Sequence, residues 1–468
     1  MSIFDIDLET YVQNFNSTKE NKELYGEVHT DFKLIHKMLN LIPYKYFKDP
    51  TLKWLDPCTG RGYFAMVLYK KLFSSLSEVF PEVHERHDHI ISNMIYLIEL
   101  NSDYIPLLKN MFGEKSHIYN EDFLQHSRKN YDFVIGNPPY NINGLIKVPT
   151  SLWDKHKEGK TVWQFFISKA LSVLKPQGHI NFITPSIWMK NDHPMYDDMI
   201  QYHIKNLHTL NNTETNKIFH GHAQTPICYF LIQNTENFNY PFDKKIILYD
   251  KIHNKYVKYN FSDHNSITNK PYSLPLFAVS IIQKLQRFII KAGSCINVTK
   301  TNMRPGYKGL ILESEFSEET PYPNITTCVL NGLQPQLVIN FSNIKCSFSG
   351  IPKLVLAHKM YGFPCLDYNG FYGISNRDNY VILNKTKQEF KKLQKFLSTN
   401  FIITLFEATR YRMKYLERYI FEMLPDITNL QDFPEDINDK TLFDYFGLDE
   451  LERNLINTFH KKRYLSFY

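Results

Sequence analysis

In the first half of the chain, short apolar runs alternate with segments whose apolar residues recur at helical spacing. Such alternation is typical of an α/β domain built on a mostly parallel sheet. A helix is predicted over residues 161–174, and the sequence Lys-Pro-Gln-Gly at 175–178 is expected to end it. Strands are predicted over residues 53–55, 94–100, 117–119, 132–135, 179–184 and 227–233.

The pattern changes near residues 238–245, where Asn, Tyr, Lys and Pro become more frequent and glycine turns recur between short apolar runs. Near the end, residues 393–424 again predict helical structure. A chain of 468 residues exceeds the size of one ordinary core. We therefore expect two domains, a nucleotide-type sheet over residues 1–245 and an irregular second domain over residues 246–468.

Composition narrows the class of protein only slightly. With 43% hydrophobic and 15% aromatic residues, the chain can fold as a globular protein. The sequence contains neither an apolar run of about 18 residues nor a signal-type N-terminus. We expect a soluble, cytoplasmic protein without a membrane anchor. The net charge of +6 suits a polyanionic partner but is also common in enzymes without one.

A glycine turn follows the first predicted strand, in the sequence from Asp56 to Phe64. Gly60 and Gly62 lack a Cβ and let the backbone approach a ligand closely. Neither a third fingerprint glycine nor a Gly-Lys-Ser/Thr phosphate loop is present. The turn therefore favours a ligand without a pyrophosphate, with Asp56 accepting hydrogen bonds from an ammonium or hydroxyl group.

Acidic residues follow the next two predicted strands. Glu99 stands where ribose hydroxyl groups are commonly bound, although the insertion over residues 78–91 lengthens its separation from the glycine turn. Asp122 and Phe123 offer a carboxylate and an aromatic ring for an adenine. A lone Gly-x-Gly is most often only a tight turn. Polar residues at successive strand ends favour a nucleoside site instead.

The sequence Asn137-Pro138-Pro139-Tyr140 directly follows another predicted strand. The Asn137 side-chain oxygen and the Pro138 carbonyl can accept hydrogen bonds from the two N–H groups of an amino nitrogen. The prolines make this turn rigid, and Tyr140 can stack on a base that has left its duplex. These residue types indicate methyl transfer to an amino nitrogen, with no general base required.

These motifs and their order resemble the gamma-class DNA adenine-N6 methyltransferases, over residues 24–235. The resemblance implies a Rossmann-like, seven-stranded S-adenosylmethionine-dependent methyltransferase sheet with one antiparallel strand. It also implies a C-terminal α+β target-recognition domain. The family's N-terminal motif is matched by residues 25–30, which implies that Thr30 lies near the methionine end of S-adenosylmethionine. The usual Thr-Pro pair is Thr30-Asp31 here.

The resemblance assigns the remaining motifs as well. Asp56, Gly60, Gly62, Glu99, Asp122 and Phe123 match the cofactor motifs, and Asn137, Pro138, Pro139 and Tyr140 match the catalytic motif. Phe219 is expected to sandwich the flipped base against Tyr140, with core packing as its rival role. The implied reaction is site-specific transfer of a methyl group to N6 of adenine in duplex DNA, as in restriction-modification systems.

Contacts with DNA are expected mainly from the second half of the chain. Basic residues interleave with tyrosines over residues 409–419, and residues 141–160 suit a loop over nucleic acid. The rival role of either segment is an ordinary solvated surface. The candidate DNA-contacting residues are Lys147, Arg304, Lys308, Arg410, Arg412 and Lys414.

Other functions stay open. The chemistry also suits an RNA base methyltransferase or a protein glutamine N-methyltransferase, and the fold suits a non-catalytic nucleic-acid-binding module. The large segment after the catalytic motif favours DNA. We expect a monomer whose restriction endonuclease, if one exists, is a separate chain. The histidines over residues 84–89 lack a standard ligand spacing, so no metal is expected.

Overall fold

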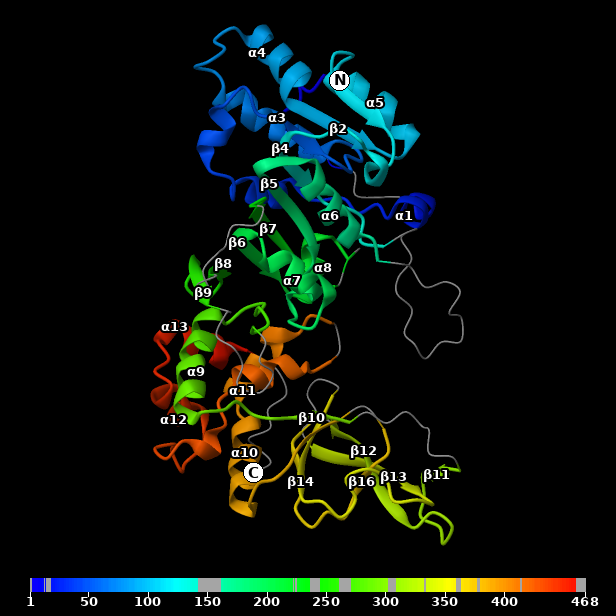
Figure 1. Ribbon diagram of the computed structural model, residues 1–468, viewed down its shortest axis with the longest axis vertical. Helices are drawn as coiled ribbons and strands as arrows, with labels where there is room; N and C mark the ends of the chain where they lie inside the picture. The colour runs from blue at the N-terminus through cyan, green and yellow to red at the C-terminus, as the bar shows by residue number, and fades with distance from the viewer. Residues whose placement is uncertain are drawn as a thin grey trace. The chain divides into compact units, whose positions relative to one another are not determined.

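In the computed structural model, the chain divides into two compact units (Figure 1). Unit 1 comprises residues 1–188, 192–241 and 246–248, and unit 2 comprises residues 189–191, 242–245 and 249–468. The structure describes residues 2–11, 13, 18–141, 161–221, 223, 225–235, 245–260, 271–301, 309–331, 334–358, 363–376, 379–412 and 415–459. Residues 189–191 lie in unit 2 although they precede most of it in sequence.

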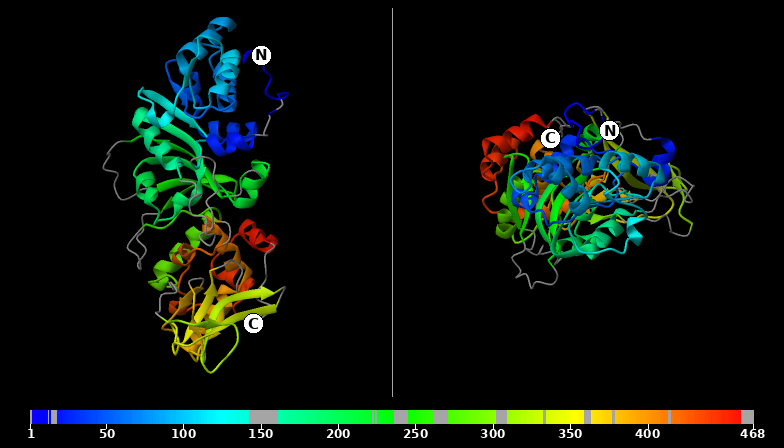
Figure 2. Two further views of the ribbon diagram at one scale, coloured as in Figure 1. Left: turned by 90° about the vertical axis from the view of Figure 1, so that its right-hand side faces the viewer. Right: turned by 90° about the horizontal axis from the view of Figure 1, so that it is seen from above.

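A largely parallel sheet forms the centre of unit 1. Its strand order begins β3-β2-β1-β4-β5-β7-β6, and β7 runs antiparallel to both of its neighbours. The pairing order continues with β8 and β9, which adds two strands to the seven that the resemblance implied, and residues 249–260 of these two strands belong to unit 2. The added pairing joins Leu248 of β8 to Leu207 of β6. Figures 1 and 2 show the helices of this unit alongside its strands.

The strands of this sheet are β1 (Trp54–Asp56), β2 (Ile95–Glu99), β3 (His117–Asn120), β4 (Tyr131–Gly136), β5 (Leu174–Pro185), β6 (His203–Leu210), β7 (Ile227–Gln233), β8 (Lys245–Asp250) and β9 (Lys255–Asn260). The α-helices of unit 1 are α1 (Lys19–Tyr25), α2 (Phe32–Leu39), α3 (Tyr63–Ser75), α4 (Val83–His89), α5 (Ile105–Phe112), α6 (Trp163–Val173), α7 (Pro194–Ile200) and α8 (Asn212–Ile218). Shorter turns of helix are η1 (Tyr44–Lys48), η2 (Ile90–Met94), η3 (Ser102–Tyr104), η4 (Phe123–Gln125) and η7 (Ser186–Met189).

Each strand predicted from the apolar runs overlaps a strand of the sheet, and the predicted helix over residues 161–174 is α6. Two details go beyond the prediction. Helix α6 ends at Val173, directly before residues 175–178, as predicted, but these residues are then part of β5, at an irregularity in its pairing with β4 where Gln177 has a φ of 67°. Strand β6 was not predicted, because a register shift between Ile204 and Asn206 interrupts its alternation of buried and exposed residues.

An aromatic stack aligns the central strands at the edge where β1 and β4 begin. Trp54 of β1 is fully buried between Phe47 and Phe133, with ring centroids at 5.1 and 4.0 Å. His179 of β5 continues the stack on Phe133 at 4.9 Å. Because Trp54 pairs in register with Phe133, and Phe133 with His179, the stack fixes the alignment of three neighbouring strands.

The glycine turn after β1 has a steric reason for its second glycine. Gly62 precedes α3 with a φ of 87°, and a Cβ built on it would lie 3.1 Å from the side chain of Leu108. Its amide donates to the carbonyl of Thr59 at 2.9 Å, which closes the turn. A side chain at this position would be strained and would also displace α5.

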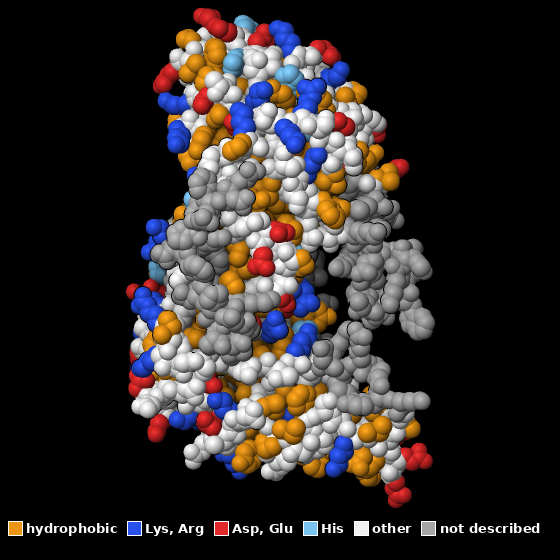
Figure 3. Space-filling model, in the orientation of Figure 1, with side chains coloured by type: hydrophobic (Ala, Val, Ile, Leu, Met, Phe, Trp, Pro, Cys, Tyr) orange, Lys and Arg blue, Asp and Glu red, His pale blue; other side chains and the backbone are white. Residues whose placement is uncertain are grey.

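Unit 2 contains two four-stranded sheets, with the strand orders β10-β17-β14-β15 and β11-β13-β12-β16. A core cluster joins strands from both sheets, through residues such as Ile325, Val355 and Val381. The charged pair Lys353 and Asp367 is buried in this unit, with 2.6 Å between Nζ and Oδ2. In Figure 3, apolar side chains gather on the face that carries β12 and β14.

The strands of these sheets are β10 (Thr299–Lys300), β11 (Leu312–Glu313), β12 (Tyr322–Asn331), β13 (Gln334–Ser342), β14 (Lys353–Ala357), β15 (Cys365–Asp367), β16 (Gly373–Ile374) and β17 (Asn379–Ile382). The helices of unit 2 are α9 (Val279–Ala292), α10 (Lys387–Leu397), α11 (Asn400–Phe406), α12 (Asp439–Tyr445) and α13 (Glu450–Thr458), with short turns η8 (Glu407–Thr409), η9 (Arg418–Met423) and η10 (Ile427–Asn429).

The helical prediction for residues 393–424 was correct only in part. Helices α10 and α11 occupy its beginning, but the backbone leaves helical geometry at Arg410, with η9 as the remaining helical turn. The basic segment over residues 409–419 is therefore not a single helix face. Across the part of the chain that the structure describes, no helix has the length and apolar character that a membrane span needs.

We predict that Gly62→Ala destabilises unit 1 by about 2 kcal/mol, through the left-handed backbone and the contact with Leu108. Gly221→Ala is the matched control, because Gly221 has a φ of 86° but nothing within 4 Å of the added Cβ. All four tryptophans fall within residues 54–188, so urea unfolding followed by tryptophan fluorescence reports unit 1. Equal destabilisation by both variants would contradict the packing argument.

Candidate active site

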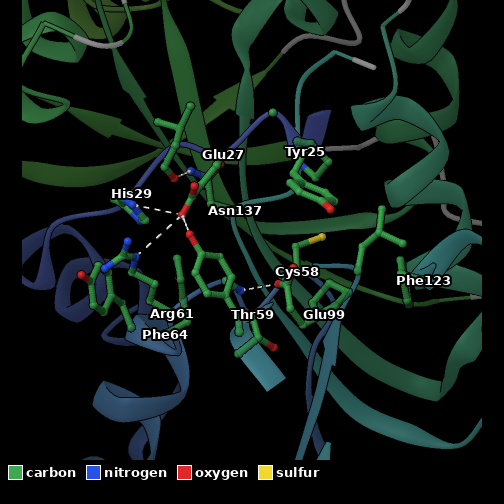
Figure 4. A pocket seen from close by; sticks show the side chains of 18 of the residues that line it. Tyr25, Glu27, His29, Cys58, Thr59, Arg61, Phe64, Glu99, Phe123 and Asn137 are labelled. Atoms are coloured by element: carbon green, nitrogen blue, oxygen red, sulfur yellow. Dashed lines mark hydrogen bonds and ion pairs between the residues drawn. The ribbon is translucent and has the colours of Figure 1, made fainter. Parts of the chain in front are cut away.

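A pocket opens at the edge of unit 1 where β1, β2 and β4 end (Figure 4). Its walls come from the segments 25–30, 57–64, 99–104 and 121–123, together with Asn137, Pro139 and Phe166. The carboxyl ends of parallel strands are the usual place for a ligand in such a sheet. Of the predicted cofactor and catalytic residues, the lining includes Thr30, Gly60, Glu99, Asp122, Phe123, Asn137 and Pro139.

Glu99 and the glycine turn are joined directly. The Gly60 amide donates to Oε2 of Glu99 at 2.6 Å, and the Asn101 amide donates to Oε1 at 2.7 Å. Burial raises the pKa of Glu99, and these two N–H groups oppose the shift. Each carboxylate oxygen retains a second lone pair for a ligand hydroxyl group. Glu99 therefore shapes the glycine turn as well as facing the pocket.

Asp56 lies directly behind the lining, with 2% of its surface exposed. Its Oδ1 accepts from the Cys58 amide at 3.3 Å, whereas its Oδ2 is buried without a hydrogen-bond partner among the described residues. Burial, reinforced by the nearby Glu99 carboxylate, raises the pKa of Asp56 to about 8. A buried carboxylate of this kind is stabilised when a cation arrives beside it.

The opposite end of the pocket is aromatic. Asp122 caps η4 by accepting from the Leu124 amide at 2.9 Å, and Phe123 is buried 5.7 Å from the ring of Phe166. Figure 4 shows Phe123 far from His29 and Arg61, with Cys58 and Glu99 between them. The pocket therefore has an apolar aromatic end and a charged end.

Asn137 directly follows β4, and its side-chain amide has a defined orientation. Its Nδ2 donates to Oγ1 of Thr30 at 3.1 Å and approaches the Val28 carbonyl at 3.5 Å. A carbonyl oxygen can only accept, so the NH₂ group must face Val28 and Oδ1 must point away from it. Oδ1 is buried and has no hydrogen-bond partner among the described residues. It is an acceptor held in place for which the described residues supply no donor.

The chain is similar to a known protein family over the segment that carries much of the pocket. Residues 44–219 match the Eco57I restriction-modification methylase family. The matched segment contains the glycine turn, Glu99, Asp122 and Asn137, and it ends at Phe219. Residues 25–30 and nearly all of unit 2 lie outside it.

Two curated relatives illustrate the level of similarity. The chain is 25% identical over 200 residues to the type II methyltransferase M.PaeR7I of Pseudomonas aeruginosa, which covers 37% of this chain and 34% of that protein. It is 26% identical over 174 residues to the modification methylase CviBIII of Paramecium bursaria Chlorella virus NC1A, covering 36% of this chain and 40% of that protein. The matches thus span well under half the length of these relatives.

Among solved structures, the type I restriction enzyme EcoKI M protein aligns with a TM-score of 0.36 and 16% identity, over 50% of each chain. The type IIL restriction-modification enzyme MmeI aligns with a TM-score of 0.45 and 12% identity, over 86% of this chain and 68% of that one.

Tyr140 and Phe219 share an apolar environment outside the lining of the pocket. Tyr140 packs against the core cluster that contains Phe219, and Phe219 has 2% of its surface exposed. Burial raises the pKa of the Tyr140 phenol, whose oxygen has no hydrogen-bond partner among the described residues. Phe219 is thus a core residue in this structure, and its contact with a flipped base stays a prediction.

Several residues of the pocket were not singled out from the sequence, and four of them form a cluster of their own. Glu27, His29, Arg61 and Tyr104 form a polar cluster in the wall of the pocket. Glu27 and His29 belong to the N-terminal motif, and Arg61 stands between the two glycines of the turn, so motif position was the signal for three of them. Tyr104 comes from η3 and had no sequence signal.

Two candidate DNA-contacting arginines of unit 2, Arg410 and Arg412, are engaged in ion pairs. Nη1 of Arg410 lies 3.0 Å from both carboxylate oxygens of Glu407, and Arg412 forms a two-pronged pair with Glu417 at 2.6 and 2.8 Å. A DNA contact through either guanidinium would first require its ion pair to open. Lys147, Arg304, Lys308 and Lys414 lie outside the described residues.

We predict that Asp56→Asn stabilises the ligand-free protein at pH 8 by on the order of 3 kcal/mol. Burial raises the pKa of Asp56 in the folded protein to about 8 from its ordinary value of 3.8, so between these two pH values the folded protein keeps a proton that the unfolded chain has lost. Wild-type stability therefore falls as pH rises through this window, and the asparagine variant avoids that loss.

Urea unfolding of both proteins at several pH values, followed by tryptophan fluorescence, checks this prediction. The difference in stability should vanish near pH 4, where both side chains are neutral. A variant less stable than wild type at pH 8 would contradict the assignment of a strained, buried carboxyl group.

Proposed function

We propose that unit 1 transfers a methyl group from S-adenosylmethionine to the exocyclic N6 of an adenine flipped out of duplex DNA. The observation that carries this proposal is the buried Oδ1 of Asn137, which is fixed by the contacts of Nδ2 and lacks a donor of its own among the described residues. The match of residues 44–219 to a restriction-modification methylase family supports it.

The pocket residues fit the proposed cofactor. S-adenosylmethionine supplies a methyl group activated by a positively charged sulfur. Phe123 and Phe166 offer apolar faces for its adenine, with Asp122 beside them for the adenine amino group. Glu99 offers carboxylate oxygens for ribose hydroxyl groups, and Thr30 offers a further acceptor in the lining. Oδ2 of Asp56, which has no partner among the described residues, is proposed to accept from a cationic group of the ligand.

At the target base, Asn137 is proposed to make a poor nucleophile reactive. The lone pair of an adenine amino group is delocalised into the ring, so the nitrogen must become tetrahedral before it can attack. Hydrogen bonds from its two N–H groups to Oδ1 of Asn137 and to the carbonyl of Pro138 favour that geometry. The prolines hold the acceptors in place before the base arrives.

Tyr140 is proposed to stack on the flipped base. A base inside a duplex cannot reach a pocket at the end of a sheet, and stacking offsets part of the cost of extruding it. The raised pKa of Tyr140 keeps its phenol neutral, which suits an aromatic face. Phe219 would complete a sandwich only if the core around it rearranged when the base enters.

The relatives bear on the substrate and on the role of unit 2. M.PaeR7I and CviBIII are named as a type II methyltransferase and a modification methylase, and the chain matches only part of each. We propose that unit 2 is the target-recognition domain, and that the chain acts on DNA as a monomer. A cognate restriction endonuclease would be a separate chain.

We predict that Asn137→Ala lowers methyl transfer to duplex DNA by at least ~100-fold, because one acceptor for the amino group is lost. Transfer of tritiated methyl groups measures the rate, and calorimetry with S-adenosylhomocysteine should show nearly unchanged cofactor binding. Asn93→Ala is the control, because Asn93 is exposed on unit 1 and distant in sequence from the motif. Unchanged turnover in Asn137→Ala would refute the acceptor role.

The same assay separates the alternative functions. Duplex DNA, ribosomal RNA and a glutamine-containing protein substrate are offered to the wild-type protein in parallel. Label on DNA alone supports the proposal. Label only on RNA or protein would keep the chemistry and reject the substrate, whereas nucleic-acid binding without any transfer would indicate a non-catalytic module.

We further predict that Asp56→Asn weakens cofactor binding by about tenfold while removing a proton-release step. In wild type, a cationic ligand lowers the raised pKa of Asp56, so binding expels a proton and affinity rises with pH up to about 8. Calorimetry in buffers of different ionisation enthalpy counts the protons released. Identical proton release by wild type and variant would show that Asp56 does not face the charged end of the ligand.

A further inference from the structure

The polar cluster around Glu27 has an unusual hydrogen-bond pattern. Oε1 of Glu27 accepts from the Tyr104 hydroxyl at 2.7 Å and lies 3.1 Å from Nε2 of His29. Nε of Arg61 lies 4.0 Å from the same oxygen. Figure 4 shows His29 and Arg61 converging on Glu27 within the pocket. All the partners in the cluster gather on one oxygen of the carboxylate.

Two buried atoms of this cluster have no hydrogen-bond partner among the described residues, namely Oε2 of Glu27 and Nε of Arg61. The Glu27 side chain is 9% exposed and the Arg61 side chain 26% exposed, and both residues line the pocket. An unpaired buried carboxylate oxygen and an unpaired buried guanidinium N–H are each costly. Side by side, they suit a ligand that carries an ammonium and a carboxylate group.

The charges around the pocket also favour a ligand with an ammonium and a carboxylate group. Four carboxylate residues line it, namely Glu27, Glu99, Glu121 and Asp122. Among the described lining residues, Arg61 is the one lysine or arginine. A ligand carboxylate would meet repulsion from most of this wall, and Arg61 alone offers a permanent positive charge to pair with it.

We propose that Glu27 and Arg61 recognise the α-amino acid end of the methyl donor, with Arg61 binding its carboxylate and Oε2 of Glu27 accepting from its ammonium group. This inference rests on the proposed function for the identity of the ligand. An ammonium group has three N–H donors, so Asp56 can serve it together with Glu27. Tyr104 and His29 are positioning residues that hold the Glu27 carboxylate in place.

Glu27 also lies next to the residues that hold Asn137, so the proposed cofactor contact and the proposed contact with the target base are close in sequence. Val28 and Thr30, which follow Glu27 in the same segment, hold Nδ2 of Asn137. One short segment therefore contacts both the amino acid end of the cofactor and the amide that receives the target base. Occupation of the Glu27 and Arg61 site would steady the segment that orients Asn137.

A pair of ligands that differ only at this end tests the proposal. S-adenosylhomocysteine carries the α-amino acid group, and 5′-methylthioadenosine lacks it. Calorimetry on the full chain should show that Arg61→Met weakens S-adenosylhomocysteine binding by about tenfold and leaves 5′-methylthioadenosine binding within about twofold of wild type. Arg128→Met is the control, because exposed Arg128 lies 4.6 Å over the Tyr119 ring, much as Arg61 lies 5.5 Å over Tyr104.

Glu27→Gln is the second variant, since it keeps the shape of the buried side chain and removes its charge. It should also weaken S-adenosylhomocysteine selectively. Equal losses for both ligands in both variants, or no loss for either, would overturn the proposal. If wild type bound neither ligand, the cofactor assignment of the proposed function would fail instead, so the two failures are distinguishable.

Discussion

The register between β1 and β4 is the constraint on which the candidate site depends. The stack of Trp54 on Phe133 aligns these strands where they begin, and both strands then run to the edge that carries the pocket. The alignment brings Asp56 beside Gly136, where an added Cβ would lie 3.2 Å from Oδ1 of Asp56. Asn137 follows immediately. A slip of one residue would turn the side chains to the opposite face and separate the carboxyl group from the amide.

The candidate site contains buried charged and polar groups that lower the stability of the ligand-free protein. Asp56 and Glu99 are buried close enough that Glu99 raises the pKa of Asp56, and one oxygen of Glu27 and the acceptor of Asn137 lack partners among the described residues. Each feature costs stability in the empty protein and is relieved by a ligand with matching charge and donors. The large aromatic core around Trp54 supplies the stability that this arrangement needs.

Strong local patterns made much of unit 1 predictable. Buried parallel strands read as apolar runs, and the glycine turn and the Asn137 motif combine residue types that few other structures require. Strand β6 was missed because its register shift breaks the alternation, and Tyr104 was missed because it reaches the pocket only through η3. In unit 2, the sequence predicted Arg412 as a DNA contact, whereas the structure shows it in an ion pair with Glu417. Such pairings depend on tertiary structure, which no local pattern records.

The central claim is that Asn137 presents an acceptor to the amino group of adenine in DNA. The most direct measurement is sequencing that detects N6-methyladenine in the DNA of cells that produce either the wild-type protein or Asn137→Ala. The account predicts methylation at one recurring sequence with the wild-type protein and none above background with the variant. Unmethylated DNA in cells that contain folded wild-type protein, or equal methylation by the variant, would contradict it.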